Sequence, residues 1–211
     1  MPKKGLIFLN GKIPSLKVVQ KFITNNNFII AADGGGNWLR KYNILPNVII
    51  GDFDSIHLKV LKYYSQKKVK IIQIIDQEIT DFEKSLKFAL KSGINKCIIF
   101  GGISSRPDHT INNFSVLKRY YKKLNLAFID EKYEITFLRK NVEFNYKINN
   151  LISILGFPIA ERITTTGLQY PLKNETLEFG VREGTLNKSI AKKISIKFNK
   201  GDLILFKRHF I

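Results

Sequence analysis

The sequence has few residues of several kinds, and cysteine is the most informative of them. Cys97 is the only cysteine among 211 residues, which excludes an internal disulfide framework and a cysteine-rich metal site. No apolar run approaches the roughly 20 residues that a membrane-spanning helix requires. The N-terminus leads into a short apolar run and lacks the long hydrophobic region of a signal peptide. We therefore expect a cytoplasmic protein without a membrane partner, in which Cys97 is a buried structural thiol.

Acidic residues are also scarce, because 17 Asp and Glu face 35 Lys and Arg, which gives a net charge of +18. Such a charge is one mark of nucleic-acid binding. However, lysine far outnumbers arginine, the lysines are scattered, and no zinc-finger, helix-turn-helix or RNP pattern accompanies them. We interpret the charge as a solvated surface that also helps to attract a polyphosphate substrate. We expect no nucleic-acid partner, although a basic nucleic-acid-binding module stays an alternative.

The few acidic residues of the N-terminal part lie in four short segments. Within the first 125 residues they are Asp33, Asp52, Asp54, Asp76, Glu78, Asp81, Glu83 and Asp108. Most of them closely follow a short apolar run. In a chain this basic, acids confined to the ends of strands indicate a metal site or a general-base cluster.

Apolar runs alternate with helical segments over the first 129 residues. Strands are predicted over residues 5–9, 28–32, 48–50, 69–75, 96–100 and 126–129, and helices between them include 14–25, 57–66 and 81–91. This alternation indicates an open parallel sheet, in which the carboxyl ends of the strands meet at one edge. We therefore expect the acids at positions 33, 52, 54, 76, 81 and 108 to converge at that edge.

The strongest local motif follows the third predicted strand, where Asp52 and Asp54 are one residue apart. Two such carboxylates repel each other, so a fold keeps them mainly when a cation or a shared proton holds them together. A solvated turn that caps the next helix is the alternative interpretation. Asp33 precedes a run of three glycines, which permits a tight turn and a close approach of the backbone to a ligand.

A second polar segment precedes the helix predicted for residues 81–91. Thr80 and Glu83 form a Thr-x-x-Glu capping-box pattern. Asp81 and Lys84 lie one turn apart and share a helix face, from which a carboxylate reaches a metal and an ammonium reaches a phosphate. Alternatively, Asp81 only interacts with the helix dipole.

A polar loop after the fifth predicted strand ends in Arg106, Asp108 and His109 at a helix start, and Asn112 and Asn113 extend the polar face by one turn. Arginine recognises phosphate through two parallel hydrogen bonds. Asp108 has three possible roles, as a metal ligand, a base or a helix cap. The loop therefore adds phosphate-binding and acid–base candidates to the expected edge of the sheet.

The pattern changes after Asp130, where helical periodicity stops. Short strand-like runs separated by turn residues, among them 151–155 and 162–166, continue to about residue 208 and indicate an antiparallel sandwich of roughly 80 residues. We predict two domains, an α/β domain over residues 1–128 and an antiparallel β-sandwich over residues 129–211.

Taken in order, five segments resemble the thiamine pyrophosphokinase (thiamine diphosphokinase) family. They are residues 32–35, 51–55, 76–84, 106–113 and 167–172. The resemblance implies an enzyme that transfers the pyrophosphoryl group of ATP to thiamine and forms thiamine diphosphate and AMP. It also implies Mg²⁺ as cofactor, ATP as co-substrate, a Rossmann-like α/β domain followed by a β-sandwich, and a homodimer with active sites between subunits.

The resemblance also implies roles for individual residues. The expected metal ligands are Asp52, Asp54, Asp76 and Asp81. Lys84 and Arg106 would stabilise charge on the transferring group, and either Asp108 or His109 would orient or deprotonate the thiamine hydroxyl. The expected nucleotide and thiamine contacts are Asp33, Gly34, Gly35, Thr80, Asn113 and Asn187.

Two positions depart from the family pattern. Ser104-Ser105 stand where a Gly-Gly pair is common, and Leu186 stands where the family often has serine. The first departure bears on the nucleotide loop and the second on the thiamine site.

An enzyme of another class shares the Asp-x-Asp motif. In haloacid-dehalogenase-type phosphatases, which the segment 52–55 resembles, Asp52 would be a covalent nucleophile and Asp54 a general acid. That family carries the motif after the first strand, whereas here it follows the third predicted strand.

Overall fold

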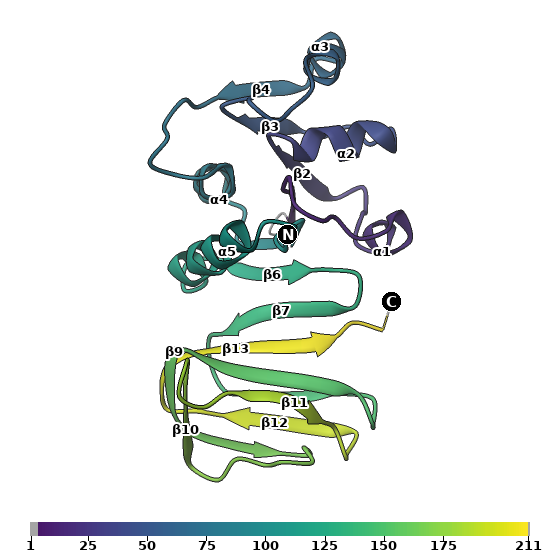
Figure 1. The fold of residues 1–211 in the computed structure, drawn as a ribbon. Helices are drawn as coiled ribbons and strands as arrows, with labels where there is room; N and C mark the ends of the chain where they lie inside the picture. Colours follow the sequence, from purple (N-terminus) through teal and green to yellow (C-terminus); the bar gives the residue numbers. More distant parts are fainter. Residues whose placement is uncertain (1–3, 211) are drawn as a thin grey trace. The chain divides into compact units, whose positions relative to one another are not determined.

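The structure is a computed structural model that describes residues 4–210 (Figure 1). The contacts between its Cα atoms divide the chain into two compact units, with the division between Glu131 and Lys132. The first unit contains strands β1–β6 and helices α1–α5, and the second contains strands β7–β13. None of the helices in the described residues is both long and apolar enough to cross a membrane.

Six parallel strands form the sheet of the first unit. They are β1 (Lys4–Phe8), β2 (Asn27–Ala32), β3 (Val48–Gly51), β4 (Lys70–Gln73), β5 (Lys96–Phe100) and β6 (Asn125–Ile129). Their order in space is β4-β3-β2-β1-β5-β6, and every neighbouring pair is parallel. The predicted parallel sheet is therefore confirmed. The strand order reverses between β1 and β5, which is where open α/β sheets bind ligands.

Five helices connect these strands. They are α1 (Leu16–Gln20), α2 (Gly35–Lys41), α3 (Leu58–Gln66), α4 (Asp81–Lys91) and α5 (Pro107–Tyr120). In Figure 1, α1 and α2 lie on one side of the sheet and α4 and α5 on the other. Helix α1 is shorter than the predicted 14–25, because Asn27 Oδ1 accepts hydrogen bonds from the amide and hydroxyl of Thr24 and forms a turn before β2.

The core of the first unit follows from the apolar strands. Leu6, Phe8 and Ile49 are fully buried and face Leu39 of α2 and Tyr64 of α3 in one hydrophobic cluster. Because parallel strands are covered by helices on both faces, they are apolar nearly throughout and leave polar residues to the loops at their ends. The polar residues of this unit are therefore concentrated in the loops that the strands position.

The second unit is antiparallel throughout. Its strands are β7 (Tyr133–Leu138), β8 (Val142–Asn145), β9 (Leu151–Thr166), β10 (Glu175–Glu178), β11 (Gly184–Lys188), β12 (Lys193–Lys197) and β13 (Lys200–Arg208). Strand β9 pairs with β10, β11, β12 and β13. The sequence predicted two strands, 151–155 and 162–166, with turn residues between them. One continuous strand forms instead, because β13 and β10 pair with β9 across this interruption.

Candidate active site

A cleft of about 570 Å³ opens at the carboxyl ends of the first unit's strands, where the strand order reverses. Every strand from β1 to β5 contributes residues from the loop that follows it. The polar and charged residues that line the cleft include Asn10, Asp33, Asp52, Asp54, Ser55, Gln77, Thr80, Asp81, Lys84, Ser104, Ser105, Arg106, His109, Asn112 and Asn113. The strand-end residues of the sequence thus meet around one cavity, as parallel topology requires.

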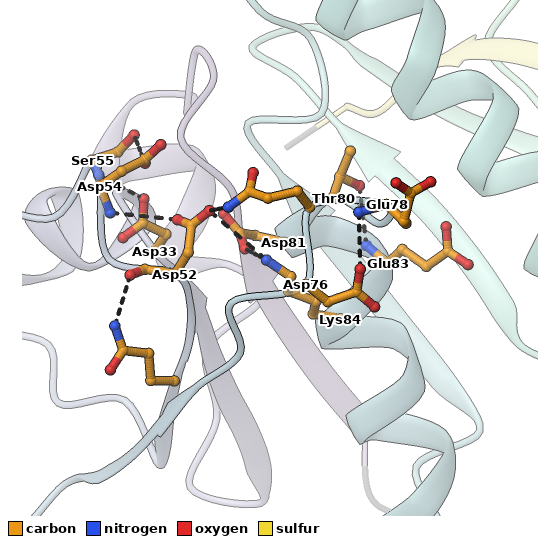
Figure 2. Close-up of polar contacts among 12 residues, drawn as sticks. Asp33, Asp52, Asp54, Ser55, Asp76, Glu78, Thr80, Asp81, Glu83 and Lys84 are labelled. Carbon is orange, nitrogen blue, oxygen red and sulfur yellow. Dashed lines mark hydrogen bonds and ion pairs between the residues drawn. The ribbon is translucent and has the colours of Figure 1, made fainter.

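Three carboxylates form a compact cluster on one wall of this cleft. Asp33 follows β2, Asp52 follows β3 and Asp81 is the first residue of α4, and each offers an oxygen within 4.8 Å of the others (Figure 2). Carboxylate oxygens are the ligands that hard cations such as Mg²⁺ bind. The chemistry of this donor set therefore fits a divalent cation.

Asp33 is the most buried member of the cluster, with 2% of its surface exposed. Its carboxylate accepts hydrogen bonds from the amide of Ser55 (2.9 Å) and from the amide of Ile56 (3.2 Å). Burial raises the pKa of Asp33 to about 6. The hydrogen bond with Asp54 and the charge of Asp81 also raise this pKa, whereas the hydrogen bonds from the two amides lower it. Burial also raises the pKa of Asp81, with the charges of Asp52 and Asp54 adding to the effect and Lys84 opposing it. A cation would relieve this repulsion.

Gly51 allows the three carboxylates to approach one another. A Cβ atom at this position would lie 2.7 Å from Asp33 Cβ and 3.3 Å from Asp81 Oδ1. Asp33 itself has a φ of 42°, in the left-handed region that few residues other than glycine adopt. The last residue of β3 and the strained backbone after β2 together make the cluster possible.

Lys84 lies on the buried side of the same cluster. Its Nζ donates to Asp81 Oδ1 at 2.9 Å and lies 4.0 Å from Asp52 Oδ2, while the side chain is only 2% exposed. Asp81 and Lys84 are one turn apart at the start of α4, where Thr80 Oγ1 accepts a hydrogen bond from the Glu83 amide at 3.4 Å. The N-cap therefore fixes the helix turn that presents a carboxylate and an ammonium to the cleft.

Two expected metal ligands lie outside the three-carboxylate cluster. Asp54 lines the cleft, is exposed, and accepts a hydrogen bond from Ser55 Oγ at 2.8 Å. Asp76 is also exposed and is not among the cleft-lining residues; its Oδ1 accepts a hydrogen bond from the Glu78 amide at 2.9 Å. Conversely, Asp33, which the sequence analysis assigned to nucleotide binding, is part of the cluster.

Another wall of the cleft is formed by the loop between β5 and α5. Arg106 forms a bidentate pair with Asp108, with Nη2 to Oδ2 at 2.6 Å and Nε to Oδ1 at 3.3 Å, and both side chains are largely exposed. The Arg106 guanidinium lowers the pKa of Asp108. His109 lines the cleft and Asp108 does not. Asn113 also lines the cleft, and its Nδ2 donates to the carbonyl of Gly102 at 2.9 Å, which holds the loop in place.

The two glycines after Asp33 are buried in the fold and do not line the cleft. A Cβ atom on Gly34 would lie 2.4 Å from Asn10 Cγ, and one on Gly35 would lie 2.0 Å from the carbonyl oxygen of Phe8. These residues therefore allow α2 to start tightly against the end of β1. The close approach is thus made to the protein itself, by Gly34 to the Asn10 side chain and by Gly35 to the backbone of β1.

Asn187 lies in the second unit, on β11, and is 7% exposed. Its Oδ1 accepts from the amide of Tyr170 at 3.1 Å and its Nδ2 donates to the carbonyl of Tyr170 at 2.7 Å. The side chain thus fastens the 167–172 segment to β11. The neighbouring Leu186 is 75% exposed and has a φ of 56°.

Sequence reasoning missed several cleft-lining residues. Asn10 follows β1, and Gln77 donates from Nε2 to Asp52 Oδ2 at 3.2 Å. Asn10 obeys the same strand-end rule as the acids and could have been found by applying that rule to polar residues in general. No local signal in the sequence singles out Gln77.

Comparison with known proteins gives a consistent result. Residues 19–128 match the family model described as "Thiamin pyrophosphokinase, catalytic domain", and residues 133–203 match "Thiamin pyrophosphokinase, vitamin B1 binding domain". The chain is 26% identical over 212 residues to thiamin pyrophosphokinase 1 of Caenorhabditis elegans, covering 90% of this chain and 84% of that protein. It is 29% identical over 224 residues to thiamine pyrophosphokinase 1 of Arabidopsis thaliana, covering 92% and 82%.

The fold has close counterparts among solved structures. The crystal structure of thiamine pyrophosphokinase from Bacillus subtilis superposes with a TM-score of 0.85 at 23% identity and covers 99% of this chain and 100% of that one. The yeast thiamin pyrophosphokinase structure gives a TM-score of 0.84 at 22% identity, covering 99% and 87%. Both likenesses concern the fold alone.

Proposed function

The chain belongs to the thiamin pyrophosphokinase family, and we propose that the cleft of its first unit is where ATP gives up its pyrophosphoryl group to thiamine. The activity of the family is ATP-dependent pyrophosphoryl transfer to thiamine, and this chain is such an enzyme. The observation that supports this location best is the three-carboxylate cluster beside the buried Lys84.

The metal of the proposed site is Mg²⁺, held by Asp33, Asp52 and Asp81. Their oxygen donors and mutual repulsion support this choice, because a divalent cation favours the charged form of all three. When bound, Mg²⁺ neutralises charge on the phosphates, which is the main requirement of phosphoryl transfer. Asp54 would act on the metal site indirectly, through its hydrogen bond to Asp33. Asp76 lies in the loop before α4 and is not a metal ligand in this proposal.

Lys84 and Arg106 stabilise negative charge on the transferring group in this proposal. Lys84 presents a fixed ammonium from α4, whereas Arg106 is exposed at the rim of the cleft and exchanges Asp108 for a phosphate. A buried ammonium such as that of Lys84 is already in place when negative charge develops on the transferring group, which lowers the barrier to transfer.

His109 is the better candidate for the group that orients or deprotonates the thiamine hydroxyl. It lines the cleft, whereas Asp108 is paired with Arg106 and has a lowered pKa, which makes it a weaker base. Thr80 and Asn113 line the same cleft and are proposed nucleotide contacts. Gly34 and Gly35 support that site indirectly, through the packing of α2 against the end of β1.

The second unit is proposed to be a β-sandwich that contributes to thiamine binding and to a homodimer with active sites between subunits. Its match to the vitamin B1 binding domain supports the first role. We propose that Asn187 acts there by holding the Tyr170 segment in place. The exposed Leu186, where the resemblance to the family leads us to expect serine, is the position at which acceptor preference would differ.

The proposed function has a direct test. The purified protein, incubated with ATP, Mg²⁺ and thiamine, should release AMP and thiamine diphosphate in equal amounts, measured by chromatography. A phosphatase of the haloacid-dehalogenase type would instead release inorganic phosphate without thiamine and form an aspartyl-phosphate on Asp52. Steeply salt-dependent RNA binding without turnover would mark a nucleic-acid-binding module.

A further inference from the structure

Glu83 is a buried acid that the proposed chemistry does not use. It is the third residue of α4, next to Lys84 in the sequence and two residues after Asp81. It is 5% exposed. Its sequence context predicted a capping box, and half of that box forms, because the Glu83 amide donates to Thr80 Oγ1. The Glu83 carboxylate instead contacts residues of α5.

The Glu83 carboxylate binds the C-terminal end of α5. Tyr120 Oη donates to Glu83 Oε1 at 2.9 Å, and Arg119 Nη1 forms an ion pair with Glu83 Oε2. Tyr120 is 6% exposed, and burial together with Glu83 raises its pKa to about 12, so its hydroxyl remains a donor at neutral pH. A buried carboxylate with these two donors joins the two helices at a defined point.

The two joined helices carry different parts of the cleft lining. Asp81 and Lys84 are on the first turn of α4, whereas Arg106 is the N-cap of α5 and His109 lies in its first turn. Apolar packing of both helices on β6 is less directional: the Phe82 and Phe114 rings each lie 5.7 Å from the Phe128 ring. Ring contacts tolerate small shifts along the helix axis, but a hydrogen-bonded carboxylate does not.

We infer that Glu83 is a positioning residue: through Tyr120 and Arg119 it fixes α4 against α5 and so sets the separation of the metal-binding wall from the phosphate-binding wall. Glu83 touches no substrate and acts through the placement of Asp81 and Lys84. This inference rests on the proposed function of the cleft. Misplacement of reacting groups by about 1 Å is enough to cost roughly 100-fold in rate.

The test compares Glu83→Ala and Glu83→Gln with Tyr120→Phe, and it uses Ser85→Ala as a matched control. Ser85 neighbours Lys84 on α4, is fully buried, and its hydroxyl has no hydrogen-bond partner among residues 4–210. We expect Glu83→Ala to lower kcat by about 10- to 100-fold at a temperature well below its unfolding transition. Glu83→Gln should recover part of this loss, because its amide oxygen still accepts from Tyr120. Adding Tyr120→Phe to Glu83→Ala should cost little more.

Mn²⁺ affinity, measured by calorimetry without substrates, provides a readout that does not depend on turnover. Glu83→Ala should weaken Mn²⁺ binding several-fold and Ser85→Ala should not. If Glu83→Ala lowers only the unfolding temperature and leaves kcat and Mn²⁺ affinity unchanged, the inference is wrong. If Glu83→Ala does not fold, the same readouts on Tyr120→Phe decide. A wild-type protein that binds Mn²⁺ but forms no AMP would contradict the proposed function, and the Mn²⁺ comparison would still test Glu83.

Discussion

Lys84 Nζ lies 2.9 Å from Asp81 Oδ1 and 4.0 Å from Asp52 Oδ2, and 2% of the lysine side chain is exposed. An ammonium buried between two carboxylates is held in one place, because both acids attract it and the surrounding protein excludes alternatives. The same two acids, with Asp33, form the cluster that fits a divalent cation. The site thus keeps a fixed positive charge next to a place for a second one, as a polyphosphate requires.

Replacement of Lys84 by methionine should keep the length of the side chain and remove its charge. We expect kcat for AMP formation to fall by about 100- to 1,000-fold, as when a preorganised charge-stabilising donor is lost. Lys87→Met is the matched control, since Lys87 is exposed and lies three residues further along the same helix. Steady-state kinetics with thiamine saturating provides the measurement. Equal rates for the two variants would remove Lys84 from the mechanism.

The proposed metal site predicts different effects for substitutions of Asp81 and Asp76. Asp81→Asn should weaken Mg²⁺ activation by at least about 100-fold, because loss of even an outer-shell partner costs 10- to 100-fold in metal affinity. Asp76→Asn should have a clearly smaller effect, because Asp76 does not line the cleft. The Mg²⁺ concentration that gives half-maximal rate measures both. If Asp76→Asn had the larger effect, Asp76 would be a metal ligand and the three-carboxylate cluster would not be the metal site.

His109 and Asp108 can be distinguished by substitution. His109→Gln should lower kcat by about 100- to 10,000-fold if the imidazole is the general base. Asp108→Asn should act mainly on KM for ATP, since it releases Arg106 from its ion pair. The two parameters are separated by varying ATP at saturating thiamine. A kcat effect confined to Asp108→Asn would make Asp108 the base.

Asp33 gives the metal-free protein a pH dependence of defined sign. Its pKa is raised from 3.8 to about 6, so the folded state holds the proton more tightly than the unfolded chain. The contribution of Asp33 to stability is therefore full below about pH 4 and is lost as the pH rises to about 6. Mg²⁺ competes with this proton, so Mg²⁺ affinity should increase over the same rise in pH.

Thermal unfolding in EDTA, compared between wild type and Asp33→Asn from about pH 4 to about pH 7, isolates this contribution. The difference in unfolding temperature should change with pH and level off above about pH 6. Parallel curves over the whole range would show that Asp33 has an ordinary pKa.

The sequence predicted the parallel sheet, since it follows from periodicity. Of the six acids expected to converge at its edge, Asp33, Asp52, Asp54 and Asp81 line the cleft, whereas Asp76 and Asp108 do not. The sequence did not predict which acids share a cluster. Asp33 joins Asp52 and Asp81 because Gly51 leaves space beside it, and Asp76 turns to cap the Glu78 amide. A sequence pattern indicates which loops meet, but the direction of each side chain depends on backbone conformation and on its neighbours.

Contacts between residues far apart in the chain could not be predicted from the sequence either. The capping-box pattern at Thr80 is local, and its competitor, the contact between Glu83 and Tyr120, joins residues 37 positions apart. The continuous strand β9 is a similar case, since pairing with β10 and β13 continues through the break predicted between residues 155 and 162. In both places tertiary contacts outweigh a correctly identified local preference.

The transfer of label from ATP tests the central claim most directly. With ATP labelled in its γ-phosphate, Mg²⁺ and thiamine, the label should appear in thiamine diphosphate, AMP should form in equal amount, and the Asp81→Asn variant should transfer little. Label in thiamine monophosphate together with ADP, or in inorganic phosphate without a thiamine product, would contradict pyrophosphoryl transfer at this cleft.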